Sequence, residues 1–281
     1  MRVHLDCFPC FLKQSIIALR LGTKDESLQK TILKSILEDI QKADISKPPA
    51  YTTTFIHKKI RHLLGRDPFE RIKSEYNQIA LRLYPSLKTI IEKSPDPLWT
   101  ATRLAIAGNI IDFGIFTSID IEGTIRIALN NPLTVDDYSS FREAISTTDK
   151  ILYLTDNAGE IVFDRLLIET LITLGKKVKA VVKGTPVIND STIEDAKESG
   201  LTIVCEVIDN GSEAVGTILE WTSPEFQRTF KDAQMIISKG QGNFETLVGN
   251  EKKIFFLFQS KCDVVSKELS LPTGSMLLKK S

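Results

Sequence analysis

The chain has 281 residues, enough for one large domain or two ordinary ones, and its 42% hydrophobic and 26% charged residues are typical of a globular protein. Its 36 basic residues balance its 36 acidic residues, so bulk charge gives no indication of nucleic-acid or membrane binding. No apolar run approaches the ~18 residues that span a bilayer, and the first residues lack the apolar stretch of a signal peptide. The four cysteines fit free thiols or metal ligands better than a disulfide framework, so we expect a cytoplasmic protein.

The first third of the chain has the pattern of helices. Apolar side chains recur three or four residues apart over 28–40, 69–83 and 99–116. Proline-containing breaks at 46–50 and 93–97 separate these stretches. The sequence therefore predicts an all-helical N-terminal region.

From about residue 149 onwards, short β-type runs alternate with helical stretches. The expected strands are 151–155, 178–182, 201–207, 233–238 and 254–258, and the expected helices between them are 162–174, 192–199 and 214–221. Such alternation predicts an α/β fold with a doubly wound, mainly parallel sheet, arranged as a three-layer α/β/α sandwich.

Helix-start signals in this second part agree with the strand–helix pattern. Ser191 and Glu194 have the spacing of a capping box at the start of one expected helix. We divide the chain into a helical N-terminal domain over 1–98 and a Rossmann-like α/β/α domain over 99–281.

Asp156, Asn157 and Glu160 follow the expected strand 151–155 and precede a helix. In an open α/β sheet, ligands bind at this edge. Asp and Asn oxygens suit cations such as Mg²⁺ or Mn²⁺, and a helix N-terminus favours an anion, so the stretch suggests a metal that holds a phosphate. A turn with a helix N-cap is the alternative. For Glu160, the roles of a general base, a support for its neighbours and a simple helix-dipole charge all stay open.

Asp190 follows the next expected strand, 178–182. The carboxyl ends of neighbouring parallel strands lie at the same edge of a sheet, so Asp190 is placed to complete the coordination begun by Asp156 and Asn157. Three protein oxygens leave positions open for water and a phosphate oxygen, as metal-assisted hydrolysis requires. Helix capping by Asp190 is the alternative, and the two roles do not exclude each other.

Lys239, Gly240 and Asn243 lie in a glycine-containing loop after the expected strand 233–238. Glycine lets backbone amides approach an oxyanion closely, and Lys239 supplies a compact positive charge. The loop lacks the Gly-Lys-Ser/Thr ending of a Walker A motif, and a plain strand-to-helix turn is the alternative.

Asn109 and Asp112 are three residues apart in a helical stretch, so they share one face of the helix. Their neighbours are apolar, and polar groups buried among them would be costly without partners. We therefore expect both residues to line the site, with a role as helix-end caps as the alternative.

Cys7 and Cys10 form a single CxxC motif. Structural zinc requires four ligands and no second CxxC is present, so metal binding, redox chemistry and simple anchoring of the first helix all remain open. His57 and His62 lie among basic residues on one helical stretch, and a solvated basic face is the favoured interpretation.

Several enzyme classes are disfavoured. The second aspartate of the haloacid-dehalogenase Asp-x-Asp motif is missing after strand 151–155, where the sequence reads Asp156, Asn157, Ala158. The sequence lacks the GxSxG motif that would indicate an α/β-hydrolase nucleophile. It also lacks the GxGxxG motif that would indicate a nicotinamide dehydrogenase.

Taken together, these segments resemble the metal-dependent damage-control phosphatases, the family also known as domain of unknown function 89. The resemblance rests on the order and combination of residues 6–10, 108–112, 156–160, 186–190 and 239–245, and it extends over nearly the whole chain. The N-terminal CxxC is similar to that of the prokaryotic, chiefly archaeal, subfamily.

The resemblance implies a helical region packed on an α/β/α sandwich and a divalent cation, with Mn, Ni, Co and Mg as candidates. It places the metal ligands on Asp156, Asn157 and Asp190. The implied substrate and phosphate contacts are Asn109, Asp112, Lys239 and Asn243. Family members hydrolyse phosphate monoesters of damaged or surplus metabolites, such as sugar phosphates and modified nucleotides or their precursors. A eukaryotic branch has been described as a carboxyl methyltransferase, but its C-terminal Arg-Thr-x-Lys motif does not occur here.

The sequence hypothesis is metal-assisted hydrolysis of a small phosphorylated metabolite. The catalytic candidates are Asp156, Glu160 and Lys239, with the amides around Gly240 helping to bind the phosphate. Water is the favoured nucleophile, and a carboxylate such as Asp156 is less favoured. The alternatives are an S-adenosylmethionine-dependent carboxyl methyltransferase and a non-catalytic nucleotide-binding module. The oligomeric state stays open.

Overall fold

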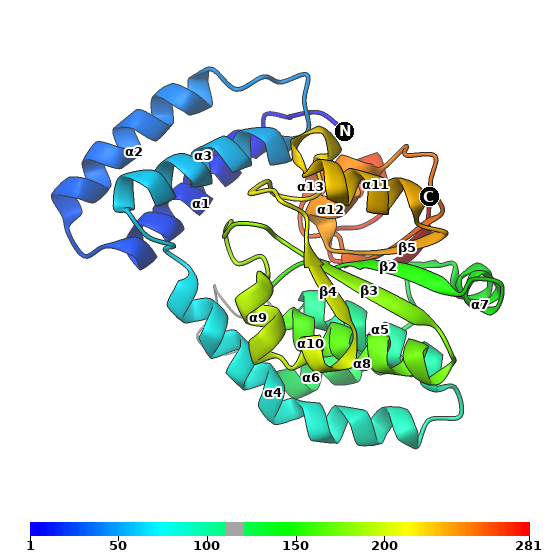
Figure 1. Ribbon diagram of the computed structural model, residues 1–281. Helices are drawn as coiled ribbons and strands as arrows, with labels where there is room; N and C mark the ends of the chain where they lie inside the picture. Colours follow the sequence, from blue (N-terminus) through cyan, green and yellow to red (C-terminus); the bar gives the residue numbers. More distant parts are fainter. Residues whose placement is uncertain (111–120) are drawn as a thin grey trace.

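The N-terminal region consists of helices, as predicted, in a computed structural model that describes residues 1–110 and 121–281. Helices α1 (Cys7–Gly22), α2 (Glu26–Gln41) and α3 (Pro49–Leu64) pack against one another (Figure 1). Asp25 caps α2 by accepting the N–H groups of Ser27 and Leu28. Ile32 and Ile36 of α2 and Ile60 of α3 belong to a core that these helices share. The long α4 (Glu70–Glu92) then leads to the sheet, where it contacts α8 and α9.

A seven-stranded sheet forms the second part of the chain. Its strands are β1 (Val135–Asp136), β2 (Lys150–Leu154), β3 (Lys177–Val182), β4 (Glu206–Asp209), β5 (Met235–Lys239), β6 (Ile254–Gln259) and β7 (Met276–Lys280). Their order is β1-β7-β6-β5-β2-β3-β4, and every pair is parallel except β6 with β7. The mainly parallel, doubly wound sheet predicted from the sequence is confirmed.

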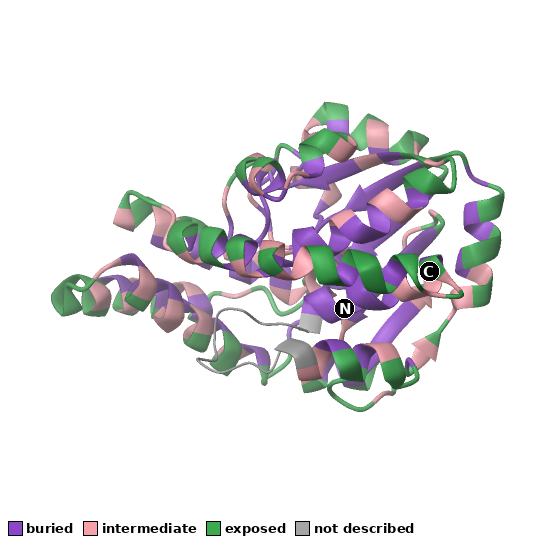
Figure 2. Ribbon diagram, turned by 90° about the horizontal axis from the view of Figure 1, so that it is seen from below, coloured by how far each residue is buried: buried purple, intermediate pink, exposed green. Residues whose placement is uncertain are grey.

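Helices cover both faces of the sheet (Figure 1). The remaining helices are α5 (Pro97–Ile110), α6 (Ile121–Asn130), α7 (Tyr138–Ser146), α8 (Glu160–Thr173), α9 (Ile193–Glu198), α10 (Leu201–Val204), η1 (Leu219–Trp221), α11 (Pro224–Asp232), α12 (Gln241–Leu247) and α13 (Asp263–Glu268). Tyr153 of β2 packs into the core that contains α5 and α8, whereas Leu152 packs into the core with α11 and α12. The central strands β2, β5 and β6 are largely buried, and the outer faces of the helices are exposed (Figure 2).

The predicted strand 201–207 is wrong in its first half, which forms the short helix α10. Gly200 has a φ of 72°, which suits glycine, and the backbone begins a new helical turn at Leu201. Leu201 is fully buried and α10 contacts α8, so tertiary packing outweighs the β-propensity of the Thr-Ile-Val run. The strand itself starts only at Glu206.

The predicted helix 214–221 is also wrong, because only Leu219–Trp221 form a short 3-10 turn. Gly216 has a φ of 67°, and a Cβ atom there would lie 2.2 Å from the Gly242 carbonyl oxygen. The flanking N–H groups are used by other helices: Val215 donates to Thr54 in α3, and Thr217 donates to Thr246 in α12. The capping box lies one residue later than predicted, at Thr192 and Asp195.

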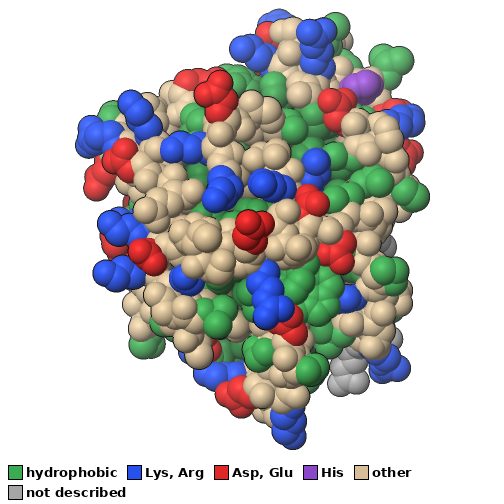
Figure 3. Space-filling view, turned by 90° about the vertical axis from the view of Figure 1, so that its right-hand side faces the viewer, with side chains coloured by type: hydrophobic (Ala, Val, Ile, Leu, Met, Phe, Trp, Pro, Cys, Tyr) green, Lys and Arg blue, Asp and Glu red, His purple; other side chains and the backbone are tan. Residues whose placement is uncertain are grey.

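The protein's surface agrees with its balanced composition. On the face shown in Figure 3, Lys and Arg side chains are interspersed with Asp and Glu. None of the helices in the described parts of the chain is long and apolar enough to cross a bilayer. The boundary between domains expected near residue 98 stays a prediction.

Candidate active site

The loops after β2 and β3 are joined side by side at the carboxyl edge of the sheet. Asn157 and Asp190 form an antiparallel backbone bridge, and the Ser191 N–H donates to the Asp156 carbonyl at 2.7 Å. The side chains of Asp156, Asn157 and Asp190 all line one cavity of about 230 Å³. The structure therefore brings together the three residues proposed from the sequence as metal ligands.

The Asp156 side chain has no ion-pair partner in the described parts of the chain to offset its buried environment. Among the described residues, no Lys or Arg side chain lies within ion-pair distance of it. Its Oδ2 accepts hydrogen bonds from Nδ2 of Asn157 at 2.8 Å and Nδ2 of Asn109 at 3.0 Å. Burial, and then the charges of Glu160 and Asp190, raise the pKa of Asp156 well above its ordinary range. A cation placed beside this carboxylate would be strongly stabilised.

Gly240 makes room for the Asp156 carboxylate. A Cβ atom at this position would lie 2.0 Å from Asp156 Oδ2, and the φ of 82° also favours glycine. The Gly240 N–H donates to the Leu257 carbonyl, so it is already used and is not offered to an anion. The glycine is thus required by the close approach of a side chain, a contact that the sequence alone does not indicate.

Lys239 is fully buried and holds two carboxylates. Its Nζ donates to Glu160 Oε1 at 2.6 Å and to Asp164 Oδ1 at 2.5 Å. It also donates to the Ala105 carbonyl at 2.8 Å, while Tyr153 donates to Asp164 at 2.8 Å. Burial outweighs the opposing charge of Lys239 and raises the pKa of Asp164 to about 7. Neither Lys239 nor Glu160 lines the cavity, so this ion-pair cluster supports the site from inside the protein.

Asn109 links the carboxylates to a neighbouring strand. Its Nδ2 donates to Asp156 and, at 2.9 Å, to Glu160 Oε2, while its Oδ1 accepts the N–H of Gln259. The amide is therefore fully used, and Asn109 does not line the cavity. Asp112, its expected companion, lies outside the described residues.

Asn243 connects α12 to the ends of two strands. Its Nδ2 donates to the carbonyls of Lys239 at 2.8 Å and Thr155 at 3.2 Å. Its Oδ1 accepts from Thr217 at 2.7 Å. The side chain is 1% exposed and contributes no atom to the cavity wall, so its contacts fix the loop after β5.

Two lysines near the cavity received no role in the sequence hypothesis. Lys183 lies 3.3 Å from Asp190 Oδ2 and also donates to the Gly216 carbonyl. Burial raises the pKa of Asp190, and Lys183 offsets that effect only in part. Lys261 is exposed and lines the cavity. A signal for both exists in the sequence, because each follows a strand closely, as Lys239 does at the end of β5.

The opposite wall of the cavity comes from the helical region. Its residues are Gln14, Ile17 and Leu21 of α1, His57 of α3, Phe69 before α4, and Ile72 and Tyr76 of α4. His57 is only 4% exposed, so its predicted place on a solvated face is wrong. It faces the interior beside the Phe69 ring, and burial lowers its pKa to about 4.

The CxxC cysteines lie in the first turn of α1. Burial raises the pKa of the Cys7 thiol, which disfavours the reactive thiolate. In residues 1–110 and 121–281, no group of three or more His, Cys, Asp or Glu side chains is arranged to hold a metal ion. The candidate cation site instead combines two carboxylates with the amide oxygen of Asn157.

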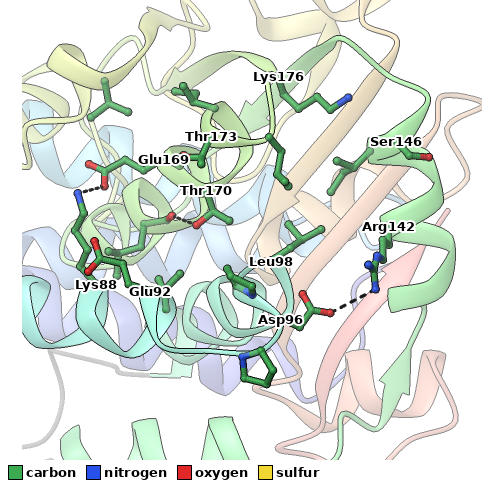
Figure 4. A pocket seen from close by; sticks show the side chains of 18 residues that line it. Lys88, Glu92, Asp96, Leu98, Arg142, Ser146, Glu169, Thr170, Thr173 and Lys176 are labelled. Atoms are coloured by element: carbon green, nitrogen blue, oxygen red, sulfur yellow. Dashed lines mark hydrogen bonds and ion pairs between the residues drawn. The ribbon is translucent and has the colours of Figure 1, made fainter.

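A larger cavity of about 840 Å³ lies near the amino ends of β2 and β3 (Figure 4). Four of its charged side chains form two ion pairs. Lys88 lies 3.0 Å from Glu169, and Arg142 lies 3.7 Å from Asp96. Size alone would favour this cavity, but its carboxylates Glu169 and Asp96 have cationic partners, whereas Asp156 at the smaller cavity has none among the described residues.

Comparison with known proteins identifies the family to which this chain is similar. The model of the damage-control phosphatase ARMT1-like domain matches residues 3–277. A damage-control phosphatase of Archaeoglobus fulgidus is 34% identical, over 99% of this chain and 99% of its own length. One from Pyrococcus horikoshii is 34% identical, over 99% of this chain and 97% of its own length.

A crystal structure extends the likeness to three dimensions. A protein of Pyrococcus horikoshii, described as a DUF89 family protein, matches with a TM-score of 0.89 at 34% identity. The match covers 100% of this chain and 99% of that one. Sequence, fold and the order of the site segments lead to one conclusion: the chain belongs to the family of damage-control phosphatases with an ARMT1-like (DUF89) domain.

Proposed function

We propose that this protein is a metal-dependent phosphatase that hydrolyses small phosphate monoesters of damaged or surplus metabolites, and so acts in cytoplasmic metabolite repair. The observation that carries the proposal is the carboxylate of Asp156, which has no cationic partner among the described residues and shares a cavity with Asn157 and Asp190. The names of two full-length relatives, both damage-control phosphatases, support the same reaction. Nucleotides, sugar phosphates and their precursors are the proposed substrates.

The residues present fit a divalent cation such as Mn²⁺, Ni²⁺, Co²⁺ or Mg²⁺. Asp156 and Asp190 offer carboxylate oxygens, which hard cations prefer. The Nδ2 of Asn157 donates to Asp156 and Glu160, so its Oδ1 is the atom it would offer to a metal. When bound, the cation would polarise the phosphate and neutralise part of its charge.

The chain's own residues would bind the anion and hold the site rigid. Lys261 supplies a positive charge at the cavity, where Gln241 and Gly242 of the first turn of α12 also lie. Lys239 fixes Glu160, and Glu160 in turn fixes the amides of Asn109 and Asn157. We therefore assign Lys239 and Glu160 to positioning rather than to contact with substrate.

Water is the proposed nucleophile. Its oxygen forms a bond to phosphorus as the bond to the ester oxygen breaks, and the products are inorganic phosphate and an alcohol. Attack by the Asp156 carboxylate is the second route. It is less favourable because a carboxylate that neutralises a cation loses nucleophilicity.

A phosphatase screen tests the proposal. The protein, freed of metal with a chelator, would be supplied with each of the four ions in turn and with a panel of nucleotides and sugar phosphates. We expect phosphate release that depends on the ion. Absence of release under all conditions would contradict the proposal, and tight metal-independent binding of S-adenosylmethionine would then favour the methyltransferase alternative.

A further inference from the structure

The wall that the helical region adds to the active-site cavity has an unusual composition. It is mostly apolar, with Ile17 and Leu21 on α1 and Phe69 and Ile72 at the start of α4. Among the described residues, the buried His57 Nε2 and Gln14 Oε1 have no hydrogen-bond partner. A buried polar atom without a partner is costly, so both atoms are natural contacts for a bound ligand.

His57 is a neutral hydrogen-bonding group rather than an anion-binding one. Burial, assisted by the nearby charge of Arg61, lowers its pKa to about 4, so the imidazole is uncharged at neutral pH. A neutral imidazole offers one N–H donor and one nitrogen lone pair. It can pair with a hydroxyl or a ring nitrogen, and it supplies no positive charge for a second phosphate or a carboxylate.

The size and polarity of the cavity limit the alcohol part of the substrate. A volume of about 230 Å³ is below the ~300–1,000 Å³ of sites for drug-sized ligands, which favours a compact molecule. A polyol would bury several hydroxyl groups against the apolar wall without partners, which costs free energy for each one. A flat ring would instead pack on this wall.

We propose that His57 and Gln14 recognise the leaving group of the substrate, and that this group is a single ring with one apolar face and a polar atom at its edge. The proposal rests on the phosphatase activity proposed above, and it narrows the substrates proposed there, because sugar phosphates have a polyol as leaving group. It places the phosphate beside Asp156 and the ring against α1, α3 and α4. The helical region thereby selects the substrate, while the sheet edge carries the reaction.

The test compares two inert probes that differ only at the ring edge: benzylphosphonate and para-hydroxybenzylphosphonate. Calorimetric binding in the presence of Mn²⁺ needs no turnover, so it is informative even if hydrolysis fails. We expect the wild-type protein to bind the hydroxylated probe roughly 3- to 10-fold more tightly, as one hydrogen bond allows. His57→Phe should abolish this preference while it leaves the affinity for benzylphosphonate within about 2-fold.

Two further variants keep the result clear. His62→Phe, on the same helix but exposed, should retain the preference. Gln14 lies on another helix, and Gln14→Leu should reduce the preference for the hydroxylated probe. This second variant keeps the proposal testable if His57→Phe folds poorly. Equal binding of the two probes by the wild-type protein, no binding of either, or a preference unchanged in both His57→Phe and Gln14→Leu would overturn the proposal.

Kinetics separate this proposal from the phosphatase activity itself. With phenyl phosphate, glycerol phosphate and adenosine monophosphate as substrates, we expect phenyl phosphate to have the highest kcat/KM. For a hydroxyphenyl phosphate, His57→Phe should raise KM and leave kcat unchanged. Release of phosphate from all substrates with glycerol phosphate preferred would overturn the leaving-group proposal alone, whereas no release from any would overturn the phosphatase proposal alone.

Discussion

The pKa values of carboxylates in the two cavities of this protein are shifted in opposite directions. At the amino edge of the sheet, burial alone would raise the pKa of Glu169, but hydrogen bonds from Tyr84, Lys88 and Arg165 outweigh it and lower the pKa. At the carboxyl edge, burial and neighbouring carboxylates raise the pKa of Asp156. The amino-edge cavity is the larger, about 840 Å³ against about 230 Å³. Charge left unpaired, rather than volume, therefore distinguishes the candidate active site.

The largest effect should separate these two carboxylates directly. Asp156→Ala should lower metal-dependent phosphate release by on the order of 10³-fold or more, because several kcal/mol of transition-state stabilisation depend on the cation. Glu169→Ala, at the amino edge, should retain activity within about 2-fold. The measurement is kcat/KM with a phosphate monoester, with circular dichroism as a check of the fold. Near-normal activity of Asp156→Ala would break the comparison.

The buried lysine beneath the carboxyl edge should matter mainly for stability. Lys239→Met leaves Glu160 and Asp164 buried without their cation, which should cost about 3–5 kcal/mol of unfolding free energy. By contrast, Lys88→Ala removes a half-exposed partner of Glu169 and should cost less than about 1 kcal/mol. Urea denaturation measures both. A loss of similar size in the two variants would contradict the distinction.

A smaller effect is expected from the glycine beside Asp156. Gly240→Ala would place a Cβ atom against the carboxylate and should displace it, with a loss of about 10- to 100-fold in metal affinity. Gly175→Ala provides a control, because φ is also positive there but no atom lies within 4 Å of the added Cβ. Calorimetry with Mn²⁺ measures the affinity. If both alanine variants bind the ion as the wild-type protein does, the close approach has no functional meaning.

The smallest expected effect is a dependence of stability on pH. Burial raises the pKa of Glu245 on α12 from 4.5 to about 7, so the folded protein holds this proton more tightly than the unfolded chain does. Its contribution to stability is complete below pH 4.5 and is lost as the pH rises through about 7. Glu245→Gln should flatten this decline by about 1–2 kcal/mol over that interval. Unfolding curves at several pH values would show whether the two proteins differ in slope.

Much of the fold is predictable from local sequence patterns. Strands β2, β3, β5 and β6 are apolar runs followed by helices, and their buried positions in a parallel sheet preserve that signal. The strand predicted at 201–207 was wrong in its first half because Leu201 is buried and α10 packs against α8, which is distant in sequence. The helix expected at 214–221 is missing from its first half, where the N–H groups of Val215 and Thr217 donate to α3 and α12, contacts that no local pattern reveals.

The candidate site was predictable where its residues lie in the loops that follow strands. Asp156, Asn157 and Asp190 do so, and the strand order brings their loops together. The burial of His57 depends on Phe69 and α4, which approach only in the folded protein. The positioning role of Lys239 likewise depends on Asp164, an acidic residue inside a helix that the sequence pattern gave no reason to select.

Titration of Mn²⁺ into the metal-free protein tests the central claim most directly, because it requires neither a substrate nor turnover. Calorimetry should show one ion bound per chain by the wild-type protein, and a loss of that binding in both Asp156→Asn and Asp190→Asn. Absence of binding for Mn²⁺, Ni²⁺, Co²⁺ and Mg²⁺ alike, or equal binding by the wild-type protein and both variants, would contradict the account.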